Sequence, residues 1–267
     1  FSKIYKQFGG KIRFFVSGGA PIEPTIISFL RYCHLDILEG YGLTETIGAC
    51  VINPIIKQKL GHVGLPAGDV QVKFAPDHEI LIKSEALFTE YSKDEEATKE
   101  AFTEDGFFKT GDIGKLSNDG FLKITDRKKD LIITAAGKNI APQKIENIMK
   151  LEKYISQVLV VGDKKKFLTC VIGIEKENFI DLYEEFGLER SSSFSELANH
   201  PKVFDKISES IQAGNEKLAS YETIKKFIIS DVPFTVESGH MTPSLKLKKK
   251  VVLEEFKTRV DALYKAK

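Results

Sequence analysis

The sequence predicts an α/β fold that begins with the end of an open α/β sheet. Residues 11–16 and 36–38 are short apolar stretches that favour strands, and residues 25–33 between them carry apolar side chains at helical spacing. This order of strand, helix and strand is typical of an open sheet, whose ligands bind beyond the carboxyl ends of the strands. We therefore expect the segments after the two strands, residues 17–21 and 39–46, to belong to a binding site.

A small antiparallel β subdomain is predicted next. Residues 70–74 and 79–83 alternate between apolar and polar side chains with the period of a strand. Residues 106–112 and 120–125 continue this pattern on either side of a turn at 118–120. These strands predict a small antiparallel sheet or barrel attached to the open sheet.

A smaller α+β domain is predicted over residues 129–267, which leaves residues 1–128 as the first domain. Its expected elements are strands at 131–133, 157–161, 167–174 and 225–229 and helices at 142–150, 178–186, 201–218 and 251–263. Three consecutive serines at 191–193 mark an exposed connection between helices.

Composition narrows the functional classes. Of the 267 residues, 42% are hydrophobic and 29% are charged, which is typical of a globular protein. The net charge of +1 predicts no attraction to nucleic acid. Cys33, Cys50 and Cys170 lie far apart, which argues against a disulfide framework or a zinc site and predicts a cytoplasmic protein. No apolar run approaches the roughly 20 residues of a membrane span.

The segment Glu39-Gly40-Tyr41-Gly42-Leu43-Thr44-Glu45-Thr46 is the most informative in the chain. It offers a nucleotide an aromatic face, glycines for close backbone approach, hydroxyls for a phosphate and carboxylates for a metal. Taken singly, each residue has an ordinary alternative, because Tyr41 could be a core tyrosine and Thr44 and Glu45 could begin a helix.

Other segments join this motif at characteristic positions. They are Gly18-Gly19-Ala20-Pro21, Thr110-Gly111-Asp112, Asp126-Arg127-Lys128-Lys129-Asp130, Gly137-Lys138-Asn139-Ile140-Ala141-Pro142 and Pro243-Ser244-Leu245-Lys246. In this order they resemble the AMP-forming acyl-CoA synthetase (adenylate-forming) superfamily. Residues 124–131, residues 138–142 and a helical insert over 195–218 make the long-chain fatty-acid–CoA ligases the most similar subgroup.

The resemblance implies that residues 1–128 are the C-terminal portion of a large adenylate-binding domain. Tyr41 would stack on adenine with its hydroxyl hydrated, and the Asp112 carboxylate would accept hydrogen bonds from both ribose hydroxyls. Arg127 would reach the ribose and phosphate side. The other residues that the resemblance places around the nucleotide are Gly18, Gly19, Ala20, Glu39, Gly40, Gly42 and Ile124.

The same resemblance assigns the phosphate chemistry to Thr44 and Glu45. Thr44 would hydrogen-bond the α-phosphate, and Glu45 would help to hold Mg²⁺, which prefers carboxylate and phosphate oxygens. Lys246 would bridge the substrate carboxylate and the α-phosphate, where an ammonium stabilises developing negative charge. The alternative for Lys246 is a basic surface loop, since Lys248, Lys249 and Lys250 follow it.

The family's small C-terminal lid domain swings between two half-reactions. Lys129 matches its hinge, and Gly137 and Lys138 match the loop along the pantetheine channel; a solvated charge run is the alternative for residues 127–130. The chain departs from the family at Ala136, where a second glycine is usual, and at Leu245, where glycine is more frequent. We expect Ala136 to affect thiol access rather than adenylation.

The implied reaction activates a long-chain fatty acid with ATP and Mg²⁺ to an acyl-adenylate, and coenzyme A then displaces AMP. Alternatives within the superfamily are a fatty acyl-AMP ligase and a carrier-loading adenylation domain, and the alternative from another class is a non-catalytic nucleotide-binding or partner-binding module. The family's phosphate loop is not found in the sequence, and the first residue is Phe1. We therefore expect a missing N-terminal part and little turnover by this chain alone. Peripheral membrane contact would suit a lipid substrate, although no basic amphipathic helix indicates it.

Overall fold

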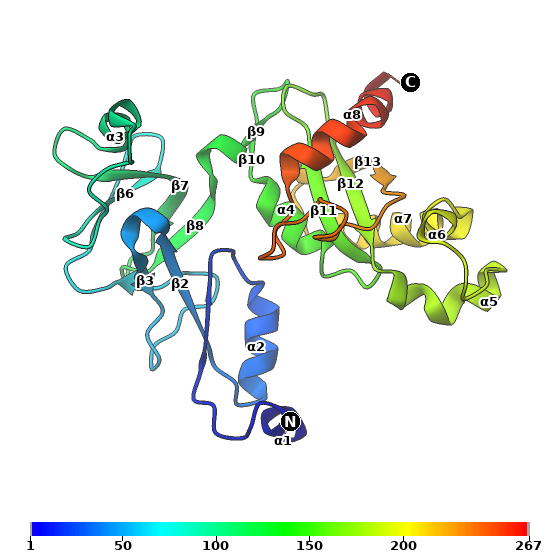
Figure 1. The fold of residues 1–267 in the computed structure, drawn as a ribbon, viewed down its shortest axis with the longest axis horizontal. Helices are drawn as coiled ribbons and strands as arrows, with labels where there is room; N and C mark the ends of the chain where they lie inside the picture. The colour runs from blue at the N-terminus through cyan, green and yellow to red at the C-terminus, as the bar shows by residue number, and fades with distance from the viewer. Residues whose placement is uncertain (1, 266–267) are drawn as a thin grey trace. The chain divides into compact units, whose positions relative to one another are not determined.

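The computed structural model describes residues 2–265 and consists of two compact units, with the division between Lys129 and Asp130. Both units combine helices with open sheets (Figure 1). The predicted α/β class is therefore confirmed. Among the described residues, no helix is both long enough and apolar enough to cross a bilayer.

The first unit begins with helix α1 (Ser2–Gln7) and a four-stranded sheet. The strands are β1 (Phe15–Gly18), β2 (Ile37–Leu43), β3 (Gly48–Ile52) and β4 (Leu65–Pro66), in the spatial order β1-β2-β3-β4. Helix α2 (Pro24–Tyr32) connects β1 to β2, which run parallel as the sequence predicts. The remaining neighbours are antiparallel, so the sheet is mixed.

Strand β2 extends further than the sequence predicts. The sequence predicts a strand at 36–38 followed by the binding-site segment 39–46, but β2 continues through this segment to Leu43 and only Thr44–Thr46 form a short 3₁₀ helix. The extension pairs with β3 on one side and with β1 on the other. These ladder hydrogen bonds outweigh the weak strand preference of the two motif glycines.

The second sheet of this unit is antiparallel and open. Its strands are β5 (Gln71–Phe74), β6 (Glu79–Lys83), β7 (Phe108–Leu116) and β8 (Leu122–Arg127), in sequence order. The first and last strands, β5 and β8, do not pair with each other. Of the two predicted alternatives, a small sheet or a barrel, the structure therefore has the sheet. Helix α3 (Glu95–Ala101), which the sequence pattern does not predict, is capped by Asp94, whose carboxylate accepts a hydrogen bond from the Ala97 amide at 3.0 Å.

A shared apolar cluster joins the two sheets of the first unit. Tyr41, Cys50 and Val51 come from the first sheet, and Ile80, Ile82 and Leu122 come from the second. Each is at most 7% exposed. The packing brings the second half of β2 close to the middle of β7, where Asp112 lies.

The second unit has a three-stranded sheet between two helical layers. Its strands are β11 (Ile155–Val161), β12 (Leu168–Ile174) and β13 (Ile224–Ile229), with β12 in the middle. A two-stranded hairpin of β9 (Ile132–Ile133) and β10 (Asn139–Ile140) precedes it. The helices are α4 (Pro142–Met149), α5 (Tyr183–Phe186), α6 (Phe194–Ala198), α7 (Pro201–Asn215) and α8 (Lys249–Lys265), with 3₁₀ turns at Lys128–Asp130, Lys176–Leu182 and Ser220–Glu222.

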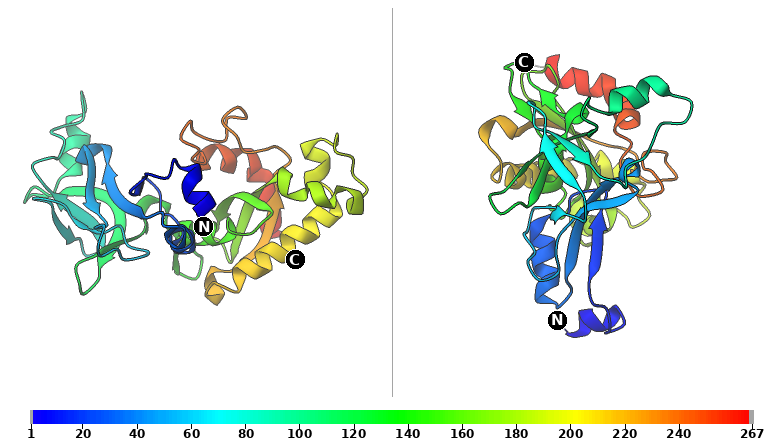
Figure 2. Two further views of the ribbon diagram at one scale, coloured as in Figure 1. Left: turned by 90° about the horizontal axis from the view of Figure 1, so that it is seen from below. Right: turned by 90° about the vertical axis from the view of Figure 1, so that its left-hand side faces the viewer.

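Alternate residues of the sheet face the two layers, as the strand period requires. Val158 and Val160 face the cluster of α4 and α7, whereas Leu159 faces the cluster of α8. Figures 1 and 2 show α8 and α7 on opposite faces of this sheet. The expected helix at 178–186 is mostly a 3₁₀ turn, and only Tyr183–Phe186 are α-helical before Gly187 ends it with φ of +71°.

Candidate functional site

Tyr41 and Asp112 lie in direct contact in the first unit, although 71 residues separate them in the sequence. The Tyr41 hydroxyl donates a hydrogen bond to Asp112 Oδ2 at 2.7 Å, and both residues are buried. Burial, and then the nearby Asp112 charge, raise the pKa of Tyr41. The expectation of a hydrated Tyr41 hydroxyl is therefore wrong: the carboxylate takes the place of water, because a buried hydroxyl requires a partner.

Arg127 completes a chain of three polar side chains. It lies directly opposite Asp112 across the β7–β8 pair, and its Nε donates to Asp112 Oδ1 at 3.1 Å. The Arg127 side chain is 45% exposed, whereas that of Asp112 is 5% exposed. The guanidinium thus covers the carboxylate from the solvent side. A carboxylate offers about four lone-pair sites, so Asp112 retains acceptor capacity for further donors.

The part of β7 that carries Asp112 is held by residues that no sequence motif singled out. Gly111 has a φ of +70°, which favours glycine, and its amide donates to Glu79 Oε1 at 2.9 Å. Glu79 Oε2 accepts from Lys128 at 2.8 Å. A signal was present, because Glu79 is a charged residue at the start of a strongly apolar strand, and a buried charge needs partners.

Thr44 and Glu45 occupy the short 3₁₀ helix after β2. Thr44 is exposed, and Glu45 is half-buried with its Oε1 accepting from the Tyr91 hydroxyl at 2.8 Å. The described residues contain no group of three or more His, Cys, Asp or Glu arranged as a metal cage. One carboxylate suits Mg²⁺ that is held mainly by substrate phosphates and water, so Glu45 fits the predicted role. No local signal identifies Tyr91, which lies 46 residues away.

The glycines of the two parallel strands lie side by side. Gly18 pairs with Gly40, and a Cβ at Gly18 would lie 3.2 Å from the Gly40 carbonyl oxygen. Gly19 has a φ of +78°; Gly18, the last residue of β1, and Gly19 and Ala20 after it are exposed. A Cβ at Gly42 would lie 1.9 Å from the Gly48 carbonyl oxygen, so only glycine fits there.

Glu39 is a buried residue of β2 and directly precedes Gly40 in the strand. Burial raises its pKa to about 7, and a hydrogen bond from the Ile22 backbone opposes this only in part. Ile124, on β8, is half-buried against the shared apolar cluster. Ile124 therefore packs against the cluster that contains Tyr41, and Glu39 lies two residues before Tyr41 on the same strand.

Gly137 and Lys138 lie in the exposed turn between β9 and β10 of the second unit. The Gly137 amide donates to the Thr134 carbonyl at 2.9 Å, and the Lys138 amide donates to Thr134 Oγ1 at 3.1 Å. Gly137 has a φ of +72°, while Ala136 is not among the residues with positive φ. The methyl group of Ala136 is exposed and adds no backbone strain to this turn. Lys129, the predicted hinge, is an exposed residue of the 3₁₀ turn at the division between the units.

Lys246 lies in a hairpin between β13 and α8. Two hydrogen bonds join Thr242 and Lys246. The Thr242 amide donates to the Lys246 carbonyl at 2.8 Å, and the Lys246 amide donates to Thr242 Oγ1 at 3.1 Å. Leu245 has a φ of +57°, in the region that favours glycine. This agrees with the resemblance noted above, in which glycine is more frequent at this sequence position. The structure therefore groups Gly18, Gly40, Tyr41, Asp112 and Arg127 in one unit and Gly137 and Lys246 in the other.

Comparisons with known proteins agree with this division of the chain. AMP-binding enzymes match residues 2–91, and the C-terminal domain of AMP-binding enzymes matches residues 129–267.

The chain belongs to the AMP-binding enzyme family. Its resemblance to adenylate-forming enzymes, inferred above from the motifs, is thereby confirmed.

Individual AMP-binding enzymes show how much of such a protein this chain represents. A long-chain-fatty-acid–CoA ligase, FadD15, of Mycobacterium bovis is 40% identical over 264 residues, which cover 99% of this chain and 44% of the ligase. Mouse long-chain-fatty-acid–CoA ligase 5 is 36% identical over 281 residues, covering all of this chain and 41% of that protein. The chain thus spans about two fifths of the length of these relatives.

Solved structures of the family share the fold. The adenylation domain of a carboxylate reductase from Mycobacterium chelonae has a TM-score of 0.80 at 28% identity and covers 98% of this chain and 40% of its own. The corresponding domain from Segniliparus rugosus was solved with AMP and a co-purified carboxylic acid. It has a TM-score of 0.77 at 26% identity, and the match covers 97% of this chain and 40% of that domain's chain.

Proposed function

We propose that this chain is the C-terminal part of a long-chain fatty-acid–CoA ligase that works through an acyl-adenylate. The observation that carries the proposal is the chain of contacts from Tyr41 to Asp112 to Arg127. It places an aromatic ring, a buried carboxylate and a guanidinium together, which are groups that can stack on a base and hydrogen-bond a ribose and a phosphate. The relatives that carry long-chain ligase names support the substrate class.

In the first half-reaction, an oxygen of the fatty carboxylate attacks the α-phosphorus of ATP, and pyrophosphate leaves. Asp112 accepts hydrogen bonds from the ribose hydroxyls, and Arg127 contributes positive charge on the phosphate side. Thr44 donates to an α-phosphate oxygen. Lys246 places an ammonium between the carboxylate and the α-phosphate, where it stabilises charge that develops in the transition state. Mg²⁺ held in part by Glu45 would neutralise phosphate charge.

In the second half-reaction, the thiol sulfur of coenzyme A attacks the acyl carbon, and AMP leaves with the carbon–oxygen bond electrons. The turn with Gly137 and Lys138 is proposed to line the path of the pantetheine arm. Lys129 is proposed as the hinge about which the lid domain turns between the two half-reactions, so that the Lys246 hairpin acts in the first and the Gly137 turn acts in the second. The proposed domains are therefore residues 1–128 for nucleotide binding and residues 129–267 for the moving lid.

An N-terminal part is proposed to complete the enzyme. The chain spans only about two fifths of its relatives, and the family's loop for the β- and γ-phosphates is not found in its sequence. This part would supply that loop and most of the acyl tunnel. We propose a cytoplasmic location with peripheral contact to membranes. The three cysteines, which are buried and unpaired, suit a reducing compartment.

A carrier-bound thiol is the second candidate acceptor, because one solved structure with this fold is the A-PCP didomain of a carboxylic acid reductase from Segniliparus rugosus. The Gly137 turn is exposed and would admit either thiol. Incubating the full-length protein with a fatty acid, ATP and either coenzyme A or a carrier protein separates the two. Acyl-CoA as the main product supports the proposal, and acyl-carrier as the main product favours the alternative.

The proposal is tested by measuring pyrophosphate release with ATP and palmitate. The full-length protein is expected to release pyrophosphate, and the 267-residue chain alone is expected to release little or none. Steady-state release by the isolated chain would contradict the proposed need for an N-terminal part. Absence of release by the full-length protein with fatty acids of several lengths would contradict the proposed reaction.

A further inference from the structure

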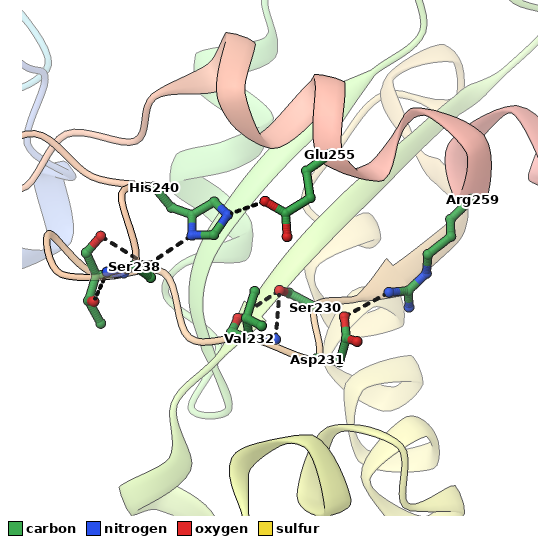
Figure 3. Close-up of polar contacts among 8 residues, drawn as sticks. Ser230, Asp231, Val232, Ser238, His240, Glu255 and Arg259 are labelled. Carbon is green, nitrogen blue, oxygen red and sulfur yellow. Dashed lines mark hydrogen bonds and ion pairs between the residues drawn. The ribbon is translucent and has the colours of Figure 1, made fainter.

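We propose that His240 is a positioning residue that holds the Lys246 hairpin in place for adenylation. The inference rests on the proposed function, since it assumes that Lys246 acts in the first half-reaction. His240 lies at the root of the hairpin and is 4% exposed, whereas Lys246 near its tip is exposed. Figure 3 shows its imidazole between Ser238 and Glu255.

Both ring nitrogens of His240 have hydrogen-bond partners. Nε2 donates to Glu255 Oε2 on α8 at 2.7 Å, and Nδ1 lies 2.8 Å from Ser238 Oγ (Figure 3). The ring also packs against Phe234 at a centroid distance of 5.1 Å, and Phe234 packs against Phe256 of α8. The imidazole is therefore fixed on three sides by the turn before it and by the helix after it.

The backbone of the same residue starts the hairpin. The His240 carbonyl accepts from the Lys248 amide at 2.7 Å, and Met241 forms a bridge with Leu247. The Met241 amide donates to the Thr235 carbonyl at 3.0 Å. Because these bonds are next to one another, a fixed His240 side chain fixes the two hairpin arms, and the Thr242–Lys246 pair continues from them.

Helix α8 is a rigid support for this arrangement. One turn beyond Glu255, Arg259 pairs with Asp231 at 2.9 Å (Figure 3). At the start of the helix, Lys249 pairs with the buried Glu146 of α4 at 2.9 Å. The segment between β13 and α8 is thus attached at its beginning by Asp231, at its middle by His240 and at its end by Lys249. Of these three, only His240 belongs to the hairpin root.

The arrangement of a serine, a histidine and a carboxylate also occurs in hydrolases, but here it does not form a nucleophile. In such triads Nε2 faces the serine and Nδ1 faces the acid, and the order here is the reverse. Ser238 Oγ also accepts from the Thr235 amide at 3.0 Å and lies 3.1 Å from the Thr235 carbonyl, so it closes a turn. The cluster therefore supports the hairpin instead of attacking a substrate.

The first test measures the two half-reactions separately in the full-length protein. H240A is expected to lower kcat for pyrophosphate release by about tenfold, since small misplacements of a reacting group have effects of this size or larger. KM for ATP is expected to stay within about twofold, because Lys246 acts in the transition state and not in ground-state binding. Thioester formation from supplied acyl-adenylate and coenzyme A is expected to be unchanged.

Two further variants serve as a rescue and as a control. H240Q keeps a side-chain amide that can donate to Glu255, and we expect it to recover most of the lost rate. D231N weakens the other attachment of the segment to α8 without touching the hairpin root, and we expect parental rates. Equal loss in both half-reactions, no loss in H240A, or a D231N defect as large as that of H240A would each overturn the proposal.

Hydrogen exchange of the 267-residue chain tests the structural part independently of activity. In H240A the Lys246 and Lys248 amides are expected to exchange at least about tenfold faster, while amides of β12 keep their protection. Unchanged exchange at these two amides overturns the proposal even if rates fall. If the parental full-length protein releases no pyrophosphate, the proposed function is contradicted, and with it the catalytic use of the hairpin. Faster amide exchange in H240A would in that case still show that His240 holds the hairpin.

Discussion

The Tyr41 hydroxyl donates a hydrogen bond to a carboxylate oxygen of Asp112 at 2.7 Å, and this contact joins the two sheets of the first unit. One residue comes from the long motif after β1 and α2, and the other comes from the short Thr-Gly-Asp motif. Their contact brings together two motifs that lie far apart in the sequence. It also gives Tyr41 a structural role besides the proposed contact of its ring with adenine.

The first prediction concerns this hydrogen bond. Tyr41→Phe keeps the ring in the apolar cluster but leaves a buried Asp112 with one donor fewer. We expect the free energy of opening of β2 and β7 to fall by about 1.5–3 kcal/mol, as is usual for a lost hydrogen bond to a charged group. Hydrogen exchange of amides in both strands measures it. Tyr32→Phe is the control, because Tyr32 is 74% exposed, and a control effect of equal size would contradict the argument.

A second prediction compares two glycines of the same strand. Gly42→Ala would place a Cβ 1.9 Å from the Gly48 carbonyl oxygen, so the β2–β3 pair must separate locally. At Gly40 a Cβ would meet its nearest neighbour, the Ala49 Cβ, at 3.5 Å. We expect Gly42→Ala to destabilise the first unit by about 2 kcal/mol or more and Gly40→Ala by much less. Thermal unfolding measures both, and similar losses would refute the steric explanation.

The third prediction is a pH dependence caused by Glu39. Its pKa in the folded protein is about 7, above its ordinary value, so the folded state holds the proton more tightly than the unfolded state does. This contribution to stability is complete below the ordinary pKa of a glutamate and is lost as the pH rises through about 7. We therefore compare the free energy of unfolding of Glu39→Gln with that of the parent at each pH. The difference is expected to be about 1–2 kcal/mol more in favour of Glu39→Gln at pH 8 than at pH 4. Urea unfolding at both pH values measures this, and a constant difference would be incompatible with it.

A fourth prediction concerns the ion pair between Lys249 and Glu146. Glu146 is 5% exposed and also accepts a hydrogen bond from the Val160 amide at 3.2 Å. Lys249→Met would remove the cation that hydrogen-bonds to this buried carboxylate, and we expect a loss of about 2–4 kcal/mol in the second unit. Lys206→Met removes the surface pair with Glu209 and is expected to lose less than about 0.5 kcal/mol. Calorimetry distinguishes the two, and equal losses would show that burial of Glu146 does not matter.

Much of the fold follows from local sequence patterns. The strand at Glu79–Lys83 has the predicted bounds, and the helices α2, α4 and α8 differ from prediction by one or two residues at most of their ends. These elements have strong apolar periodicity, so local pattern and final environment agree. The fold class and the family also follow from the sequence, because the motifs keep a recognisable order.

Other features depend on partners that lie far away in the sequence. Strand β2 continues through Gly40 and Gly42 because β1 and β3 supply ladder partners, and no local preference indicates this. The contact between Glu45 and Tyr91 and the burial of the Tyr41 hydroxyl arise in the same way. His240 was missed because a single histidine in a loop has no pattern, and its role depends on Glu255 of α8.

The binding of AMP and of 2′,3′-dideoxy-AMP to the 267-residue chain and to Asp112→Asn tests the central claim most directly. If Asp112 accepts hydrogen bonds from the ribose, the parental chain should bind AMP roughly tenfold more tightly than the dideoxy compound, and Asp112→Asn should remove most of that difference. Calorimetric titration measures the four affinities. Equal weakening of both ligands by Asp112→Asn, or a parental chain that does not distinguish them, would contradict the account.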